Sequence, residues 1–545
     1  MSIATQVISL MYNLQPAQNG VRHVRNVDVP SEDGIILKTD LYFPRPKGTY
    51  PTILMRNPYK RRSFSMVADL YAERGYNVVL QAVRGTDGSS GVFNPLSHER
   101  VDGLATIDWI KKQDWFDGRL GLNGPSYLGY CALAIIDAVP EGGAVAIKAT
   151  SADFERIVFP SGAFHLQLWL SWLQTVYGLH NRLLGMTMRM ISGDIERKTV
   201  EIGKTLPLLD ADVAAVGQKV PFWRDWMEHA IGNHDFWAER NHTHRLNENT
   251  PPTSFVTGWY DLMAGGHLDD YRRLVDAGHV PHLTIGNWHH TDNELQGESL
   301  RQTFEWFDTY LLGKPERLRK KPVRIFVSGT ERWHDLDAYP PPTTGHVFFL
   351  GGGSVLSRMA DDEPEPARFT YNPADPTPSV GGPMFAFAGA GAQNNNELEK
   401  RADVVTFTSA PLAQDLTYVG SPKAHLFVRS SLPHADFFVR ICDVDEQDNS
   451  INISDAIVRM TPETHKPDND GIYALDLKLS ANGHTFLAGH KIRLQVSGGA
   501  HPRFARNLGT NEPVATATRM LTSDREILMD ETHHSSIELP VWQPN

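Results

Sequence analysis

Short apolar runs alternate with amphipathic stretches over more than half of this chain. The runs cover 52–56, 77–83, 119–123, 145–149, 254–258 and 282–286. Between the second and third runs, apolar side chains recur at helical spacing, at Val101, Leu104, Ala105, Ile107 and Ile110. Buried strands separated by helices are typical of a parallel, doubly wound sheet. Such a sheet gathers functional residues at the carboxyl ends of its strands.

Two regions before residue 250 depart from this alternation. The β-rich segments 23–29 and 35–43 flank Asp33-Gly34, which is a strong hairpin signal. From about 152 to 245 no sheet strand is evident, and tryptophans lie among helical patterns, at Trp169, Trp172, Trp223, Trp226 and Trp237. Such an insert is either a lid over an active site or a second helical core, and the sequence favours neither.

The chain becomes β-rich after about residue 321. Strand-like runs with turn signals between them cover 323–328, 347–350, 424–429, 437–444, 456–460, 473–479, 491–496 and 537–541. This pattern is typical of a β-sandwich or jelly roll. The stretch 351–400 is rich in Gly, Pro and Asn, which predicts mostly irregular connection.

Composition restricts the classes of partner and compartment. The chain has 545 residues and a net charge of −12, which argues against a nucleic acid or an anionic membrane as partner. Cys131 and Cys442 lie far apart in apolar segments, as buried free thiols of a reducing compartment do. The apolar stretch 7–14 has no Lys or Arg before it. We therefore expect no signal peptide, no membrane span and a cytoplasmic protein.

A serine between glycines follows the run at 119–123, in Gly124-Pro125-Ser126-Tyr127-Leu128-Gly129. Strand, glycine-flanked serine and helix form the layout of a nucleophile elbow. The usual pattern is Gly-x-Ser-x-Gly, so the second glycine here comes one residue late. The hexapeptide alone also fits a serine that caps a buried helix.

Two later segments supply an acid and a base in the order that α/β-hydrolases use, serine, then acid, then histidine. Asp261 follows the run at 254–258, and His289-His290 follow the run at 282–286. A serine hydroxyl needs a base to take its proton, and the base needs an orienting carboxylate. Taken singly, Asp261 fits a helix cap and the histidines fit a surface loop. Their order after successive strands favours catalysis.

The chain resembles the cocaine esterase and X-Pro dipeptidyl peptidase family of serine hydrolases, which includes the α-amino-acid ester hydrolases. The stretches that carry the resemblance are Arg56-Asn57-Pro58-Tyr59, Val83-Arg84-Gly85, the Ser126 hexapeptide, Gly258-Trp259-Tyr260-Asp261, Gly286-Asn287-Trp288-His289-His290, Tyr371-Asn372-Pro373-Ala374-Asp375-Pro376 and Asp455-Ala456-Ile457-Val458-Arg459-Met460. The resemblance implies an α/β-hydrolase core (1–149 and 247–345), an inserted helical cap (150–246) and a C-terminal jelly roll (346–545).

The resemblance also implies roles for single residues. Ser126 would be the nucleophile, Asp261 the orienting acid and His290 the base, because the family's histidine comes two residues after this tryptophan. His289 stands where the family more often has serine. The oxyanion hole would combine the backbone N–H of Tyr127 with the hydroxyl of Tyr59, which also fits an ordinary core tyrosine. We further expect Trp169 and Trp172 of the cap to line the substrate pocket.

The sequence therefore predicts a serine hydrolase that cleaves carboxylic esters or related acyl compounds through an acyl-enzyme. The expected partner is a small ester or amide substrate. The proposed chemistry needs no cofactor, and the sequence contains no metal-binding motif. A homo-oligomer is left open. The alternative is an X-Pro dipeptidyl peptidase or an amidase/acylase, which needs an anionic anchor for the substrate amine, with Asp153, Glu155 and Asp225 as candidates. A non-catalytic carbohydrate-binding or scaffold protein is disfavoured by the complete Ser, Asp and His set.

Overall fold

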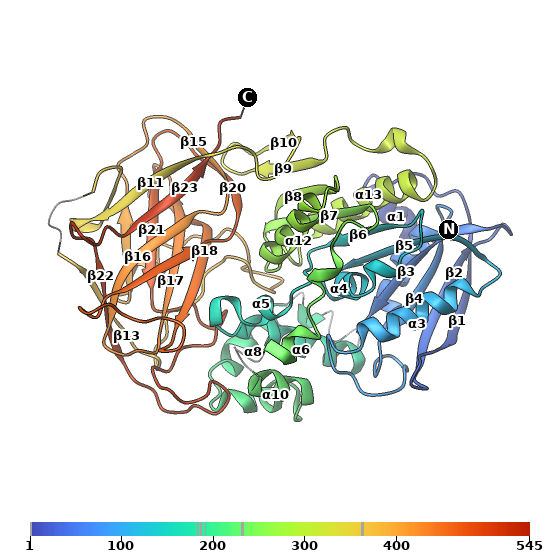
Figure 1. The fold of residues 1–545 in the computed structure, drawn as a ribbon, viewed down its shortest axis with the longest axis horizontal. Helices are drawn as coiled ribbons and strands as arrows, with labels where there is room; N and C mark the ends of the chain where they lie inside the picture. The colour runs from blue at the N-terminus through green and yellow to red at the C-terminus, as the bar shows by residue number, and fades with distance from the viewer. Residues whose placement is uncertain are drawn as a thin grey trace.

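The computed structural model describes residues 3–181, 185, 188–190, 192–229, 234–360 and 365–544. The chain forms two β-rich bodies, with a helical segment at their lower border (Figure 1). The first body holds the N-terminal half of the chain together with residues up to about 336, and the second holds the remainder.

A ten-stranded sheet forms the first body, in the order β1-β2-β4-β3-β5-β6-β7-β8-β9-β10. The strands from β4 to β9 along this order are parallel, so the predicted α/β fold is confirmed. Their bounds are β1 (Val21–Pro30), β2 (Ile36–Pro44), β3 (Tyr50–Asn57), β4 (Asn77–Ala82), β5 (Phe116–Pro125), β6 (Ala144–Lys148), β7 (Thr253–Tyr260), β8 (His282–His289), β9 (Val323–Val327) and β10 (Arg332–Leu336). The run 323–328, which resembles the later β-rich runs, is β9 and pairs with β8.

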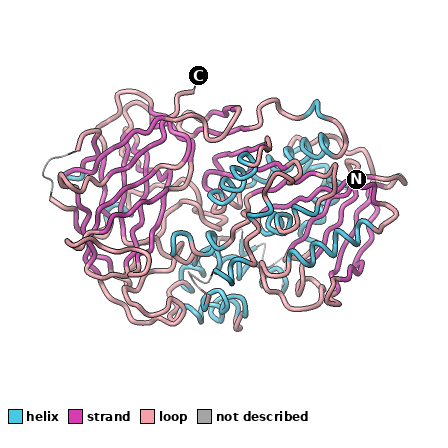
Figure 2. The backbone as a smooth tube through the Cα atoms, viewed as in Figure 1, coloured by secondary structure: helices cyan, strands magenta, loops and turns pink. Residues whose placement is uncertain are grey.

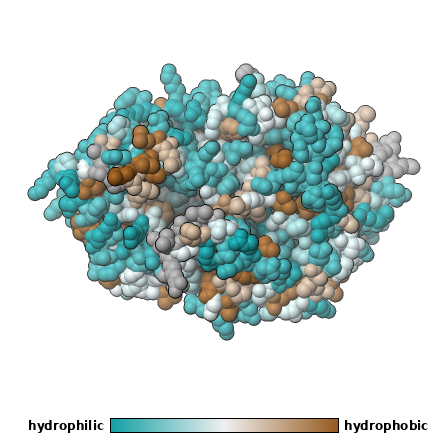
Figure 3. Space-filling model, turned by 180° about the vertical axis from the view of Figure 1, so that it is seen from behind, coloured by the Kyte–Doolittle hydropathy of each residue, from teal (hydrophilic) through white to brown (hydrophobic). Residues whose placement is uncertain are grey.

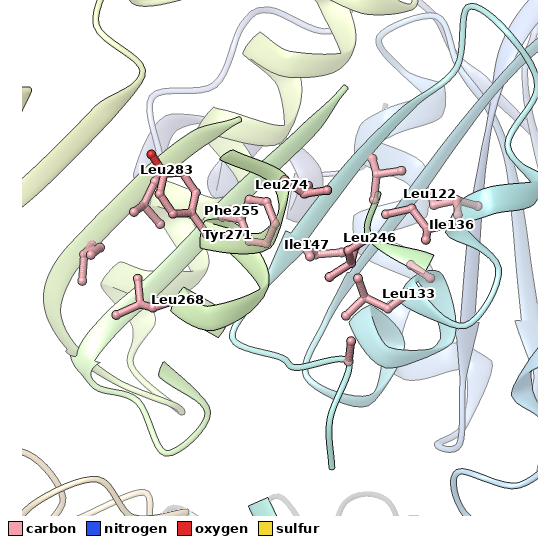
Figure 4. Close-up of a cluster of buried hydrophobic side chains, with 14 of the residues drawn as sticks. Leu122, Leu133, Ile136, Ile147, Leu246, Phe255, Leu268, Tyr271, Leu274 and Leu283 are labelled. Carbon is pink, nitrogen blue, oxygen red and sulfur yellow. The ribbon is translucent and has the colours of Figure 1, made fainter. Parts of the chain in front are cut away.

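Helices cover both faces of this sheet because its central strands are apolar on both sides. Leu54 of β3 faces one core, shared with α3 (Glu99–Lys111) and α12 (Ala264–Asp276). Ile53 and Met55 face the other core, shared with α2 (Ser65–Ala72) and α13 (Asn293–Tyr310). Figure 4 shows the first core, where side chains of β5, β6, β7 and β8 meet those of α12.

The segment between β6 and β7 is helical. It contains α5 (Glu155–Val158), α6 (Leu166–Asn181), α8 (Asp194–Ile202), α9 (Ala211–Val216), α10 (Pro221–Glu228) and α11 (His234–Ala238). The five tryptophans of this segment are at most 4% exposed and share one cluster. The ring centroids of Trp169 and Trp226, for example, lie 4.6 Å apart. Of the two readings that the sequence left open, the tryptophans support a second helical core.

The second body is a 13-stranded, strongly folded sheet whose described strand pairs are antiparallel except for β12 with β14, and it is the all-β region that the sequence predicts. Its strands are β11 (Thr344–Gly351), β12 (Val355–Ser357), β13 (Ala367–Tyr371), β14 (Val404–Thr408), β15 (Leu416–Gly420), β16 (Lys423–Ser430), β17 (Ala435–Val444), β18 (Ser450–Met460), β19 (Tyr473–Lys478), β20 (Asn482–Phe486), β21 (Lys491–Ser497), β22 (Ser523–Leu528) and β23 (Ser536–Val541). Mostly loops join them (Figure 2), with short 3-10 helices at Gly352–Ser354 and Leu398–Lys400.

A long connection links β13 to β14. Residues 372–397, all of them described, contain neither helix nor strand, in keeping with the irregular segment that the sequence predicts. We refer to residues 380–391 within it as the connecting loop. The sequence missed the short strands β12 and β13, which lie within the predicted irregular stretch.

The exterior is mixed in character. The face seen in Figure 3 is mostly hydrophilic, with apolar side chains in small separate patches. Among the described residues, no helix combines the length and the apolar character needed to cross a bilayer. Cys131 and Cys442 are both free and buried, as expected.

Candidate active site

Ser126 lies in a sharp turn between β5 and α4 (Tyr127–Leu133), with φ 53° and ψ −125°. Glycines make this turn sterically accessible. A Cβ on Gly124 would lie 2.3 Å from Leu128 Cβ, and a Cβ on Gly129 would lie 2.7 Å from Thr150 Cγ2. The absent side chain at 124 thus leaves room for Leu128, and the late glycine allows α4 to pass close to Thr150.

Hydrogen bonds join Ser126, His290 and Asp261 into one chain of contacts. His290 Nε2 lies 3.1 Å from Ser126 Oγ, and His290 Nδ1 lies 3.0 Å from Asp261 Oδ2. The other carboxylate oxygen of Asp261 accepts the backbone N–H of Met263 at 2.7 Å, which fixes its orientation. The three side chains follow β5, β7 and β8 at one edge of the sheet. The geometry can support proton transfer from serine to histidine.

His289 occupies a different environment. Its Nδ1 lies 3.1 Å from Thr291 Oγ1, and the Thr291 hydroxyl donates to the carbonyl of Ala386 at 2.6 Å. Burial lowers the pKa of His289, which favours the neutral ring. The contacts of His289 therefore tie the loop after β8 to the connecting loop, whereas those of His290 lead to Ser126.

The two groups that the sequence predicts as oxyanion donors lie near Ser126. The backbone N–H of Tyr127 opens α4 and has no hydrogen-bond acceptor in the described part of the chain. The Tyr59 hydroxyl accepts a hydrogen bond from Trp172 Nε1 at 3.0 Å, so its own proton remains available to a ligand. Burial raises the pKa of Tyr59 to about 12, which keeps that proton in place at neutral pH.

A pocket of about 330 Å³ opens beside Ser126. Its lining is largely apolar and includes Tyr59, Phe64, Ser126, Leu128, Lys148, Thr175, Leu179, Met190, His290, Leu295, Phe385 and Phe387. Thr175 and Leu179 come from α6, so the inserted segment contributes a wall as well as its own core. The pocket is large enough for a small ester.

Trp169 and Trp172 are not among the described lining residues, contrary to our expectation. Helix α6 turns Thr175 and Leu179 toward the pocket, and its tryptophans pack behind them. The Trp172 ring stacks on Tyr127, with centroids 6.0 Å apart, and Trp172 Nε1 donates to Tyr59. Trp172 thus contacts the predicted oxyanion donors instead of the open space of the pocket.

Sequence reasoning missed the residues that the connecting loop supplies. Phe385 and Phe387 line the pocket, and the Phe385 and His290 rings lie 5.7 Å apart. Gln167 holds the loop, because its amide accepts the Phe385 N–H at 3.1 Å and donates to the Phe385 carbonyl at 2.5 Å. Two phenylalanines in an irregular, glycine-rich stretch carry no periodicity that would have placed them here.

The carboxylates considered as anchors for a substrate amine lie elsewhere. No Asp or Glu occurs among the described residues that line the pocket. Asp153 pairs with Arg156 at 3.2 Å. A cationic substrate group would find no opposite charge in this lining.

Comparison with known proteins matches the two halves of the chain to two family models of one kind of enzyme. Residues 33–292 match the family model described as X-Pro dipeptidyl-peptidase (S15 family). Residues 318–538 match the model of the X-Pro dipeptidyl-peptidase C-terminal non-catalytic domain. The cocaine esterase of Rhodococcus sp. (strain MB1 Bresler) is 29% identical over 574 aligned positions, which cover 95% of this chain and 98% of that protein.

Solved structures share the complete fold. An α-amino acid ester hydrolase superposes with a TM-score of 0.80 at 23% identity, over 97% of this chain and 98% of that one. An aminopeptidase from a marine sediment Thaumarchaeota archaeon gives a TM-score of 0.80 at 22% identity, with the same coverage. The two family models together match residues 33–292 and 318–538, and the chain is a serine hydrolase of the cocaine esterase and X-Pro dipeptidyl-peptidase family.

Proposed function

We propose that this protein hydrolyses small carboxylic esters through an acyl-enzyme formed on Ser126. The observation that carries the proposal is the hydrogen-bonded series Ser126–His290–Asp261, which borders a largely apolar pocket. The series provides a nucleophile, a base within 3.1 Å of it and a buried carboxylate behind the base. These are the three parts that acyl transfer to a serine requires.

In the acylation step, Ser126 Oγ attacks the ester carbonyl carbon while His290 Nε2 takes its proton. Asp261 accepts the hydrogen bond from Nδ1–H and stabilises the resulting imidazolium. The carbonyl oxygen becomes an oxyanion and accepts hydrogen bonds from the Tyr59 hydroxyl and the Tyr127 N–H. Collapse of this intermediate breaks the bond to the alcohol oxygen, which receives the proton from His290.

In the deacylation step, water attacks the acyl carbon of the ester formed on Ser126. His290 now takes a proton from the water, and the same two donors hold the second oxyanion. The bond to Ser126 Oγ breaks, His290 returns the proton to that oxygen, and the carboxylic acid leaves. Every proton passes through His290 Nε2, so no other base is required.

The pocket favours an ester over a dipeptide substrate. A dipeptidyl peptidase must recognise a free ammonium group, which a nearby carboxylate would stabilise. The described lining contains no carboxylate. We therefore expect turnover of p-nitrophenyl butyrate and little turnover of Ala-Pro p-nitroanilide.

The decisive test compares Ser126→Ala with the control Ser192→Ala, which alters an exposed serine of the inserted segment. Ser126→Ala should abolish p-nitrophenyl butyrate turnover and covalent labelling by a fluorophosphonate, with an unchanged circular dichroism spectrum. The control should keep both. Turnover or labelling that persists in Ser126→Ala would show that the nucleophile has been assigned wrongly.

A further inference from the structure

Lys148 lines the pocket beside Ser126 and has no opposite charge next to it among the described residues. It ends β6 beside Pro125 of β5, and its carbonyl oxygen accepts the Ser126 N–H at 2.9 Å. The residue is only 7% exposed, yet it lines the pocket next to the predicted nucleophile. The backbone of Lys148 therefore contacts the Ser126 turn, and the residue itself lines the pocket.

The ammonium group of Lys148 has no hydrogen-bond or ion-pair partner among the residues that the structure describes. Two other carboxylates make hydrogen bonds with other groups, although Glu196 Oε2 is buried without a partner among the described residues. Glu196 accepts the N–H of Phe387 at 2.6 Å, and Glu294 accepts the Trp288 indole N–H at 3.1 Å. Other residues that line the pocket with Lys148, such as Leu128, Ala149 and Leu295, carry no charge.

A buried cation without a counter-charge is destabilising unless something pairs with it. Burial lowers the pKa of Lys148 to about 8, so the side chain is still mostly protonated at neutral pH. The pocket thus keeps a positive charge in apolar surroundings, where an ion pair is stronger than in water. A bound anion would supply the missing partner, and the space that Lys148 lines is the pocket beside Ser126.

We propose that Lys148 binds a carboxylate carried by the substrate, so that the preferred substrates are esters bearing a free acid group. The inference rests on the proposed esterase function and narrows its substrate class. Lys148 moves no proton in this scheme and acts through charge alone. The carboxylate can belong to the acyl part, as in a hemiester of a dicarboxylic acid, or to the alcohol part, and the substrates below distinguish the two.

The first experiment measures the preference for an anionic over a neutral ester. Mono-p-nitrophenyl glutarate is compared with p-nitrophenyl pentanoate for the acyl part, and 4-carboxyphenyl acetate with phenyl acetate for the alcohol part. In the wild type, one anionic ester should have the higher kcat/KM of its pair. Lys148→Met should lower that ratio at least about tenfold, chiefly through a higher KM for the anionic ester. Lys148→Glu should reverse the preference.

The control is Lys400→Met, which removes an exposed lysine that is paired with Glu397 in the C-terminal body. It changes the net charge by the same amount and should leave both ratios unaltered. An anionic-to-neutral ratio that is equal in the wild type and in Lys148→Met, for both substrate pairs, would overturn the proposal.

A binding measurement separates this proposal from the esterase proposal. Ser126→Ala, with Lys148 intact, is titrated calorimetrically with glutarate, with 4-hydroxybenzoate and with their neutral amides. A carboxylate that binds at least about tenfold more tightly than its amide supports the lysine site, whatever Ser126→Ala does to turnover. Equal affinity of both acids and their amides contradicts the site, even if Ser126 proves to be the nucleophile.

Discussion

At Ser126, one residue combines a side-chain hydroxyl, a backbone φ of 53° and the start of a helix. A positive φ is unfavourable for serine, and the surrounding contacts hold it in place. The Ser126 N–H donates to Lys148, and its carbonyl accepts the N–H of Tyr130 at 3.1 Å. The strain exposes Oγ at the end of the strand, where His290 can reach it.

The two adjacent histidines should differ sharply in function. His290→Gln should lower kcat/KM for p-nitrophenyl butyrate by about 10³-fold or more, because it removes the base beside Ser126. His289→Gln should change it less than about fivefold, because that ring contacts Thr291. Steady-state kinetics of both variants would test this. The reverse order of effects would mean that the base has been misassigned.

Tyr59 should act mainly in the transition state. Tyr59→Phe removes one oxyanion donor and should lower kcat about 10²–10³-fold with little change in KM. Trp172→Phe keeps the tyrosine and removes only the hydrogen bond to its oxygen, so its effect should be well under tenfold. Separate kcat and KM values for the two variants provide the measurement; a loss confined to KM in Tyr59→Phe would contradict the oxyanion role.

The unpaired lysine also makes a prediction about stability. The pKa of Lys148 in the folded protein, about 8, lies below that of an unfolded lysine. The burial of a charged Lys148 therefore lowers the unfolding free energy fully below about pH 8. This cost shrinks as pH rises and is gone above about pH 10.5. Below pH 8, Lys148→Met should be more stable than the wild type by about 1–3 kcal/mol.

The measurement is urea unfolding of both proteins at several pH values. The difference in unfolding free energy between Lys148→Met and the wild type should shrink between pH 8 and 10.5. At pH 7, added glutarate should also shrink it, because glutarate would bind and stabilise only the wild type. A difference that stays constant over this pH range would mean that the lysine is not perturbed.

At the scale of elements, the sequence pattern predicts those strands whose side chains are buried. The parallel strands β3 to β8 are buried over most of their residues, β5 only from Leu120 onward, so each one contains an apolar run. Strands such as β10, with the burial pattern of a surface edge, give no such run and were missed. The sequence also placed Ser126, Asp261 and His290 after the correct strands, because strand ends can be located without knowing how side chains pack.

The Ser126 turn should tolerate no side chain at Gly124. Gly124→Ala places a Cβ 2.3 Å from Leu128 Cβ, so either the strand or α4 must shift. We expect a loss of about 2–4 kcal/mol in unfolding free energy and nearly complete loss of activity. Gly265→Ala in α12 is the matched control, since a Cβ there meets nothing within 4 Å and alanine favours a helix by about 1 kcal/mol. Equal stability of the two variants would contradict the steric argument.

At the scale of the whole molecule, the substrate pocket is assembled from both bodies and the insert. The pocket combines the sheet edge at Ser126, α6 of the insert and Phe385 of the connecting loop. Such long-range convergence has no signature in local sequence. The sequence predicts Trp169 and Trp172 in the pocket, but helical phase directs both side chains into a buried cluster that the insert shares with residues such as Tyr127.

A buried ionic group anchors the connecting loop. Asp455 on β18 pairs with Arg440 at 2.8 Å and with Arg503 at 2.8 Å. Arg440 in turn donates to the Asn395 amide oxygen at 2.8 Å and to the Val380 carbonyl. Burial alone would raise the pKa of Asp455, but the two arginines outweigh it and lower the pKa.

Asp455→Asn should leave two buried arginines without a counter-charge and cost about 3–5 kcal/mol. Because the group supports the loop that carries Phe385, KM for p-nitrophenyl butyrate should rise as well. Asp476→Asn, which alters an exposed pair with His425, should change stability by no more than about 0.5 kcal/mol. Thermal unfolding and kinetics of both variants test this. An unchanged KM in a destabilised Asp455→Asn would show that the ionic group does not position the loop residues that line the pocket.

Because the C-terminal body reaches the reaction centre through only a few loop residues, selectivity and chemistry can change independently in this architecture. Exchange of residues 384–387 among related enzymes should alter which acids are released while the proton-transfer apparatus stays intact. In a mutagenesis library selected for new substrates, beneficial substitutions should therefore accumulate in a segment more than 90 residues along the chain from His290, within a domain that supplies none of the three side chains proposed to react.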